Sequence, residues 1–184
     1  MPRNDPSPRP AFTPPEQIEL LVLDVDGVLT DGRINIASDG TEFKSFDVTD
    51  GAGIKYWMRA GRQVVIISGR ACASVTLRAA ELGITSVRQN MKDKLPAYLS
   101  VLEELNVPAQ RTAVMGDDLP DLPLMRRCGF PIAPANGCEE ARQAAALVTG
   151  RGGGAGAVRE AVEYLLKASG AWEQILRRYY EDKK

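Results

Sequence analysis

The stretch Leu20-Leu21-Val22-Leu23-Asp24-Val25-Asp26-Gly27-Val28-Leu29-Thr30 decides the fold of this chain and points to its chemistry. An apolar run ends in two carboxylates, Asp24 and Asp26, which are separated by one residue and followed by glycine. Such a run is typical of a buried strand in a parallel sheet, whose carboxyl end is where these sheets bind ligands. Two like charges buried together are unfavourable unless a cation neutralises them. The stretch therefore predicts a divalent metal and a phosphoryl substrate, with an acidic turn at a strand end as the plain structural alternative.

The composition narrows the kinds of chemistry open to the chain. Its 184 residues suit one domain, and a formal net charge of −1 gives no reason to expect nucleic acid or a membrane surface as a partner. The sequence contains no histidine, which excludes Ser-His-Asp hydrolases, histidine phosphatases and His-ligated zinc enzymes. The three cysteines (Cys72, Cys128 and Cys138) are odd in number and widely spaced, so we expect free thiols and a cytoplasmic location.

Strand-like and helix-like segments alternate along the chain. Apolar, β-rich segments recur at residues 20–23, 64–67, 86–87, 112–115, 130–132 and 147–149. Segments with helical spacing lie between or after them, at residues 54–60, 71–82, 94–105, 122–127, 139–146 and 157–168. This alternation predicts repeated βαβ units and hence an α/β fold with a doubly wound parallel sheet.

One segment breaks the alternation, and the two ends of the chain differ from its centre. Residues 33–46 contain the turn signature Ser38-Asp39-Gly40, so we expect a β-hairpin inserted after the first strand; a cap domain of ~50–100 residues would not fit in the remaining length. Residues 1–17 hold six of the twelve prolines and are expected to form a disordered leader before a folded domain at 18–170. Apolar residues at helical spacing predict an amphipathic tail at 171–184, which docks either on a neighbouring subunit or on its own core.

Two further motifs are expected to meet Asp24 at the carboxyl ends of the strands. Ser68 ends the strand at 64–67, where its hydroxyl suits a phosphoryl oxygen, or where Ser68 is a plain helix N-cap. Lys94 opens a helix, where a cation opposes the helix dipole and needs a compensating role. Neutralising Asp24 and the phosphate would provide that role, for which Lys92 is a competitor and a solvated surface lysine is the plain alternative.

An acidic motif follows the strand at 112–115, where Asp117, Asp118 and Asp121 lie within five residues. Asp117 is expected to complete an oxygen-only octahedral Mg²⁺ site with Asp24, a main-chain carbonyl and waters. Asp118 and Asp121 are expected to orient the metal-bound waters or the neighbouring lysine. An acidic helix start is the alternative, but it does not explain three carboxylates in so short a segment.

Asp24 and Asp26 are expected to have different catalytic roles. Asp24 is the expected nucleophile, forming an aspartyl-phosphate, and Asp26 is the expected general acid and base. Together these motifs resemble the haloacid dehalogenase superfamily of aspartate-nucleophile phosphatases over about residues 17–168. The resemblance is closer to the capless branch that contains the phosphatases of 3-deoxy-D-manno-octulosonate 8-phosphate. This narrower match is carried by residues 24–32, 46–54, 67–70, 94, 116–121 and 156–160.

The resemblance implies an Mg²⁺-dependent phosphoric monoester hydrolase of lipopolysaccharide biosynthesis that acts on a phosphorylated 3-deoxy-ulosonic acid, first of all the octulosonate 8-phosphate. It implies that Mg²⁺ is held by Asp24, Asp117 and the carbonyl of Asp26. It assigns catalysis to Asp24, Asp26 and Lys94, and substrate contacts to Asp26, Asp47, Thr49, Asp50, Gly51, Lys55, Ser68, Gly69, Arg70, Arg78 and Lys94. It further implies a homotetramer whose hairpins meet around the symmetry axis, with a neighbouring subunit helping to cover each active site.

The sequence departs from the octulosonate-phosphate pattern at Thr49 and Ala155, where that group usually carries basic residues that would face an acidic sugar. Phosphatases of nine-carbon sialic-type acid 9-phosphates resemble this chain at the threonine, whereas Arg70 favours the octulosonate group. Two other classes are alternatives. A phosphoacceptor signalling domain is disfavoured by Asp26, which would make the phosphorylated state short-lived, and a non-catalytic oligomerisation module is disfavoured by the complete set of catalytic residues.

Overall fold

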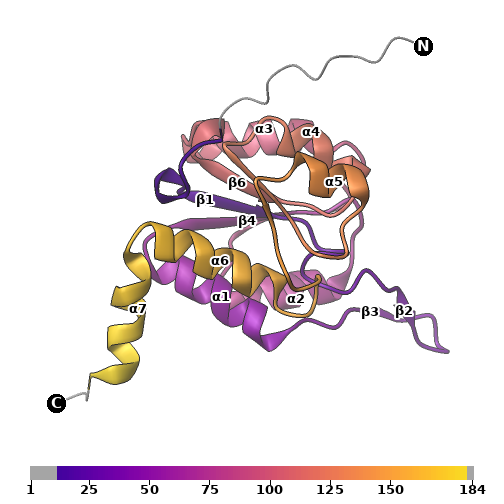
Figure 1. The fold of residues 1–184 in the computed structure, drawn as a ribbon. Helices are drawn as coiled ribbons and strands as arrows, with labels where there is room; N and C mark the ends of the chain where they lie inside the picture. Colours follow the sequence, from indigo (N-terminus) through magenta and orange to yellow (C-terminus); the bar gives the residue numbers. More distant parts are fainter. Residues whose placement is uncertain (1–11, 182–184) are drawn as a thin grey trace, which may run out of the picture.

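A computed structural model describes residues 12–181 and shows a parallel sheet between two layers of helices (Figure 1). The sheet has the strand order β5-β4-β1-β6-β7-β8, with every neighbouring pair parallel. The strands span Leu20–Leu23 (β1), Gln63–Ile67 (β4), Ser86–Arg88 (β5), Thr112–Met115 (β6), Phe130–Ala133 (β7) and Leu147–Val148 (β8). The predicted doubly wound α/β fold is therefore confirmed.

The two helical layers cover the sheet because β1 is apolar on both faces. Leu21 and Leu23 contact one hydrophobic cluster and Leu20 and Val22 the other, as the alternation of side chains along a strand requires. The first layer contains α1 (Val48–Arg59), α2 (Ala73–Leu82), α6 (Ala157–Ala168) and α7 (Ala171–Tyr180). The second contains α3 (Lys94–Leu105), α4 (Leu122–Met125) and α5 (Glu139–Ala144). The two layers lie on opposite sides of the sheet in Figure 1.

Helix α1 begins six residues earlier than the spacing of apolar residues predicts. Asp47 is its N-cap, and the carboxylate accepts a hydrogen bond from the backbone N–H of Thr49 at 2.6 Å. Gly51 and Gly53 disfavour a helix by propensity, which concealed this first half in the sequence. Close packing favours glycine at both positions, because a Cβ at Gly53 would lie 3.0 Å from the Cα of Arg159, and one at Gly51 would lie 3.1 Å from Cδ2 of Leu82 and displace the end of the Arg78 side chain. Tight packing against α2 and α6 therefore overrides propensity here.

The predicted hairpin is present between β1 and α1, and it projects from the body of the molecule (Figure 1). Strands β2 (Asn35–Ile36) and β3 (Glu42–Phe43) pair antiparallel, with Asn35 opposite Phe43. Ile34, Ile36 and Phe43 are exposed on it, at 54, 66 and 47 % of their surface. In the part of the chain that the structure describes, this hairpin is the only insertion between β1 and α1, and no cap domain is present.

The C-terminal helix α7 packs on its own chain. Trp172 and Ile175 are each 8 % exposed and belong to the cluster formed with α1 and α6. The ring of Trp172 meets the ring of Tyr56 edge-on, with centroids 5.8 Å apart, and the hydroxyl of Tyr179 accepts a hydrogen bond from Arg59 at 3.0 Å. Of the two docking modes expected for the tail, the structure therefore shows the one on the chain's own core.

The described fold also extends N-terminally of residue 18. Pro15–Gln17 form a turn of 3-10 helix, and the backbone N–H of Thr13 donates to the carbonyl of Gly129 at 2.9 Å. The predicted leader at 1–17 is thus partly structured at its end, while residues 1–11 and 182–184 lie outside the described residues. None of the helices between residues 12 and 181 combines the length and the apolar character needed to cross a membrane.

Candidate active site

The carboxyl ends of the three central strands bring the predicted residues together. Strand β1 pairs in register with both β4 and β6, so the residues that follow the three strands meet at one edge of the sheet. A pocket of about 350 Å³ opens there. Its lining residues are Asp24, Asp26, Gly32, Gly69, Arg70, Met91, Lys92, Lys94, Asp117, Asp118, Pro120 and Asp121.

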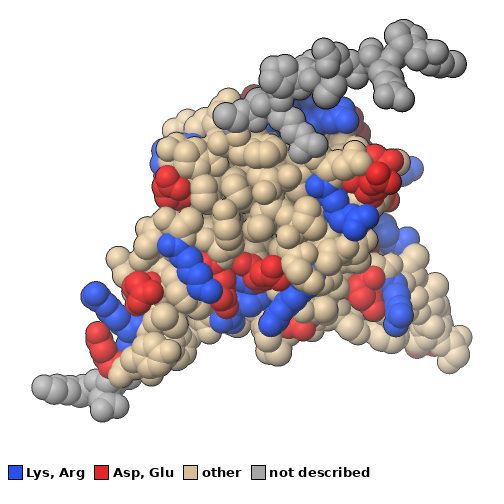
Figure 2. Space-filling model, in the orientation of Figure 1, with Lys and Arg blue, Asp and Glu red and all other residues tan. Residues whose placement is uncertain are grey.

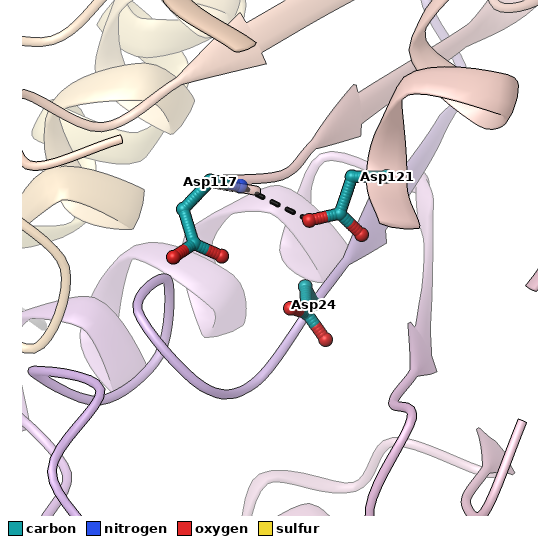
Figure 3. Close-up of side chains that lie close together, drawn as sticks. All are labelled: Asp24, Asp117 and Asp121. Carbon is teal, nitrogen blue, oxygen red and sulfur yellow. Dashed lines mark hydrogen bonds between the residues drawn. The ribbon is translucent and has the colours of Figure 1, made fainter. Parts of the chain in front are cut away.

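Three aspartates form the centre of this pocket. Asp24, Asp117 and Asp121 each place one carboxylate oxygen within 4.8 Å of the others. Figure 3 shows the three side chains around a common space, with Asp117 and Asp121 coming from the segment after β6 and Asp24 from the end of β1. The carboxylate of Asp121 also accepts hydrogen bonds from the backbone N–H groups of Asp117 and Asp118, at 3.1 and 3.3 Å. Asp121 therefore fixes the loop that presents Asp117.

Lys94 is the cation that contacts this cluster. It is 5 % exposed, and its Nζ lies 2.8 Å from Oδ1 of Asp24 and 2.7 Å from Oδ1 of Asp121. Its position is set by Asp93, which caps α3 by accepting from the N–H of Leu95 at 3.1 Å. The alternative of a solvated Lys94 is therefore wrong. Lys92 lines the pocket but is exposed.

The electrostatics of the cluster call for a further cation. Burial, with the charge of Asp121 added, raises the pKa of Asp24 from 3.8 to about 7, although Lys94 opposes the shift. Burial, with the charges of Asp24 and Asp121, likewise raises the pKa of Asp117 to about 7. For Lys94, burial acts against the charge, but Asp24 and Asp121 raise its pKa above the usual value. One ammonium group thus faces three carboxylates, and an all-oxygen donor set of this kind fits Mg²⁺.

Asp26 faces the hairpin rather than the aspartate cluster. Its carboxylate forms an ion pair with Lys44, whose side chain is 1 % exposed. Glu42 forms two further ion pairs: its Oε1 lies 3.4 Å from Nζ of Lys44, and its Oε2 lies 3.0 Å from Nη2 of Arg70. Nε of Arg70 in turn lies 3.9 Å from Oδ2 of Asp26. These four residues form a closed ring of charges that ties the hairpin to the loop after β1.

Lys44 and Glu42 were not among the residues predicted for the site. Their signal is weak: a spacing of two residues would place both side chains on one face of an extended segment, but it does not say which loop that face meets, and β3 itself ends at Phe43. Only the packing of the hairpin against the end of β1 shows that they lie beside Asp26.

Ser68 and Gly69 lie where they were predicted, at the end of β4. Ser68 is 1 % exposed, and its Oγ accepts from the backbone N–H of Arg70 at 3.3 Å. A Cβ at Gly69 would lie 3.9 Å from Cε of Lys94, so this segment runs beside the lysine. Helix α2 begins only at Ala73, with Cys72 as its N-cap, and the interpretation of Ser68 as a helix N-cap is therefore wrong.

The remaining predicted substrate residues form a separate group around the first turn of α1. Arg78 donates to the carbonyl of Asp47 at 3.4 Å and packs against Gly51, and the charge of Lys55 acts on Glu81 of α2. None of this group, which comprises Asp47, Thr49, Asp50, Gly51, Lys55 and Arg78, lines the pocket of the three aspartates.

Asp50 binds the backbone at the start of α6. It is 1 % exposed, and its carboxylate accepts from the backbone N–H groups of Gly156 and Arg159, at 3.3 and 2.8 Å. It therefore anchors the start of α6 and does not line the pocket of the three aspartates. Arg151, which the sequence analysis did not select, lies near Thr49: a Cβ at Gly156 would be 2.6 Å from Nη1 of Arg151 and 3.3 Å from Oγ1 of Thr49.

The comparisons with known proteins agree with this geometry. A family model described as haloacid dehalogenase-like hydrolase matches residues 83–159. The 3-deoxy-D-manno-octulosonate 8-phosphate phosphatase KdsC of Escherichia coli (strain K12) is 42 % identical over 159 residues, which cover 86 % of this chain and 85 % of that protein. The chain therefore belongs to the haloacid dehalogenase-like hydrolases, in the group of the KdsC phosphatases.

Solved structures of this group share the fold. The 3-deoxy-D-manno-octulosonate 8-phosphate phosphatase of Moraxella catarrhalis, in complex with magnesium ion, phosphate ion and a KDO molecule, superposes with a TM-score of 0.88 at 41 % identity and covers 90 % of this chain and 95 % of its own. The cobalt-bound phosphatase YrbI of Haemophilus influenzae gives a TM-score of 0.82 at 38 % identity, covering 85 % of this chain and 91 % of its own.

Proposed function

We propose that this chain is an Mg²⁺-dependent phosphatase that hydrolyses a phosphorylated 3-deoxy-ulosonic acid, namely 3-deoxy-D-manno-octulosonate 8-phosphate, in lipopolysaccharide biosynthesis. The observation that carries the proposal is the buried cluster in which Lys94 contacts Asp24 while Asp117 and Asp121 lie within 4.8 Å. The substrate assignment is supported by the names of relatives that share about two fifths of their residues with this chain along most of its length.

In the proposed reaction a carboxylate oxygen of Asp24 attacks phosphorus, and the bond between phosphorus and the sugar oxygen breaks. Asp26 acts in its protonated form, for which it must first leave its ion pair with Lys44: it gives that proton to the leaving oxygen and then takes a proton from the water that attacks the aspartyl-phosphate. That second step breaks the bond between phosphorus and Asp24 and releases phosphate. Lys94 keeps the carboxylate of Asp24 oriented, since its Nζ lies 2.8 Å from Oδ1.

The metal would be held by the carboxylates of Asp24 and Asp117 and by the carbonyl of Asp26. When bound, Mg²⁺ neutralises these carboxylates and polarises the phosphoryl oxygens. Gly69 and Arg70 line the same space, where a backbone N–H suits a phosphoryl oxygen and Arg70 adjoins the proposed position of the leaving sugar. Ser68 directly precedes them at the end of β4, and its hydroxyl is assigned to a second phosphoryl oxygen.

The acidic end of the sugar is assigned to the basic side chains outside the aspartate cluster that the sequence predicts as substrate contacts, namely Lys55, Arg70 and Arg78. Thr49 favours a second candidate, a phosphatase of nine-carbon sialic-type acid 9-phosphates. A phosphate-release assay with Mg²⁺ distinguishes the two, comparing octulosonate 8-phosphate, a nine-carbon acid 9-phosphate and neutral sugar phosphates at equal concentration. We expect the highest kcat/KM for the octulosonate 8-phosphate; a preference for neutral sugars would reject both acidic substrates.

We further propose that the chain forms a homotetramer in the cytoplasm. The exposed apolar side chains Ile34, Ile36 and Phe43 of the hairpin support a contact between copies, because exposed apolar side chains grouped in one place mark interaction sites. On the face drawn in Figure 2, basic and acidic side chains are interspersed, which supports a partner other than nucleic acid. The three cysteines are free, as a reducing compartment favours.

The assembly is tested by light scattering after size-exclusion chromatography. The wild-type chain is expected to elute with the mass of four copies, whereas Ile36→Asp shifts the mass toward the single chain. Thr41→Asp, on the same hairpin at its turn, is the control and should keep the larger mass. A single-chain mass for the wild type at micromolar concentration would contradict the tetramer.

A further inference from the structure

Asn136 joins two loops that are far apart in the sequence. It lies between β7 and α5, where the chain crosses the carboxyl edge of the sheet. Its side-chain NH₂ donates to the carbonyl of Gly27 at 3.1 Å, and its side-chain oxygen accepts from the backbone N–H of Gly153 at 2.6 Å. One amide thus uses both its donor and its acceptor to hold the loop after β1 against the glycine-rich loop before α6.

Gly27 is the residue next to the proposed metal-ligating carbonyl of Asp26. Its φ is +86°, and a Cβ there would lie 2.0 Å from Oδ2 of Asp117, so only glycine fits. Its N–H is directed at Oγ1 of Thr30 at 3.4 Å, while its carbonyl accepts from Asn136. Gly27 is therefore held on both of its peptide groups.

The direction of a backbone carbonyl depends on the backbone alone, because the group has no rotamer of its own. The carbonyl of Asp26 belongs to the peptide group that joins it to Gly27, so its direction is set by the backbone angles of these two residues. Contacts that fix Gly27 on either side therefore fix the direction in which the Asp26 carbonyl points.

The loop that carries Asn136 also contacts the other side of the proposed metal site. The backbone N–H of Cys138 donates to the carbonyl of Asp117 at 2.7 Å, and a Cβ at Gly137 would lie 3.5 Å from the Cα of Asp117. Asn136 and Cys138 thus connect two segments that each carry a proposed ligand. On the remaining side a Cβ at Gly153 would lie 1.8 Å from the carbonyl oxygen of Gly27, so the glycine-rich loop closes directly over this peptide.

We propose that Asn136 is a positioning residue of the metal site: it sets the Asp26 carbonyl relative to Asp117 and so determines the affinity for Mg²⁺. The inference rests on the proposed function, because that function supplies the metal and the role of the Asp26 carbonyl. Groups that orient metal ligands from the next layer change metal affinity by about 10–100-fold when they are replaced.

The test measures Mg²⁺ binding by isothermal titration calorimetry on the full chain, without substrate. In Asn136→Ala we expect the Kd for Mg²⁺ to rise by about tenfold or more. Asn136→Asp keeps the acceptor for Gly153 but turns a carboxylate oxygen toward the carbonyl of Gly27, and it should weaken binding at least as much. Gln143→Ala, which removes a surface amide from α5, is the matched control and should bind Mg²⁺ like the wild type.

Thermal unfolding in EDTA distinguishes an effect on the metal site from a loss of stability of the whole protein. Asn136 is exposed, so its loss should leave the midpoint of the metal-free protein within a few degrees of the wild type. Wild-type Mg²⁺ affinity in both Asn136 variants would overturn the positioning role of Asn136 while leaving the proposed function intact. Failure of the wild type itself to bind Mg²⁺ would overturn the proposed function. A fall in kcat at saturating Mg²⁺ with unchanged Mg²⁺ affinity would also overturn that positioning role.

Discussion

Asp24→Asn is expected to reduce turnover by at least about 10³-fold while leaving the fold intact. The carboxamide has nearly the shape of the carboxylate but cannot attack phosphorus, so no aspartyl-phosphate forms. Its oxygen can still accept the hydrogen bond from Lys94, which lies 2.8 Å from Oδ1 in the wild type. Because burial raises the pKa of Asp24 to about 7, the site already disfavours the charge, and a neutral group there should not destabilise the chain.

The measurement is phosphate release with saturating Mg²⁺ and octulosonate 8-phosphate, together with a circular dichroism melt. Asp39→Asn is the matched control, since Asp39 lies in the hairpin turn, where its Oδ1 accepts from the N–H of Thr41 at 2.9 Å and asparagine can do the same. The control should keep wild-type turnover. Near-normal activity in Asp24→Asn would reject the mechanism, and a phosphorylated Asp24 that persists after acetyl-phosphate treatment of the wild type would support the phosphoacceptor alternative.

Lys94→Met is expected to lower the free energy of unfolding by about 3–5 kcal/mol at pH 8 in EDTA, and to abolish activity. Methionine fills the space of the alkyl chain but leaves Asp24 and Asp121 buried without their shared ammonium group. Removing one partner of a buried ion pair has a large effect because the remaining charge stays out of water without compensation.

The free energy of unfolding of Lys94→Met depends on pH, and the sign of this dependence follows from the pKa of Asp24. Its folded pKa of about 7 lies above the ordinary value of 3.8, and without Lys94 it rises further. The folded state then binds more protons than the unfolded state between these pKa values, so its stability falls as the pH rises through them. The loss of unfolding free energy in Lys94→Met, relative to the wild type, should therefore be largest at pH 8 and become smaller toward pH 5.

Urea denaturation at the two pH values checks this expectation. Lys92→Met is the control, because Lys92 lines the same pocket but is exposed, and its stability should stay within about 0.5 kcal/mol of the wild type. An equal loss of unfolding free energy at pH 5 and pH 8 would show that Lys94 stabilises the chain by packing rather than by charge.

The architecture and the centre of the site could be predicted from the sequence for a physical reason. A strand buried on both faces must be apolar throughout, and helices must show an apolar stripe, so β1, β6 and α3 are visible in the chain with their bounds intact. Parallel strands then bring their carboxyl ends to one edge. Local patterns thus sufficed to place Asp24, Lys94 and Asp117 in one pocket.

The residues that were missed or misplaced depend on contacts between segments far apart in the chain. Nothing near Asp50 in the sequence shows that its carboxylate caps α6 more than a hundred residues later. The glycines of α1 weaken the helical pattern locally, and their benefit appears only where α2 and α6 press against them.

By itself, then, the sequence determined the parallel sheet, the hairpin after β1 and the group of carboxylates and lysine at the strand ends, because burial and periodicity are written into short segments. Only the tertiary structure decided that Lys44 and Glu42 lie beside Asp26, that the tail packs on its own core, and that Asn136 joins the loop after β1 to the glycine-rich loop before α6. Those contacts join surfaces of polar or mixed character, whose partners no local pattern specifies.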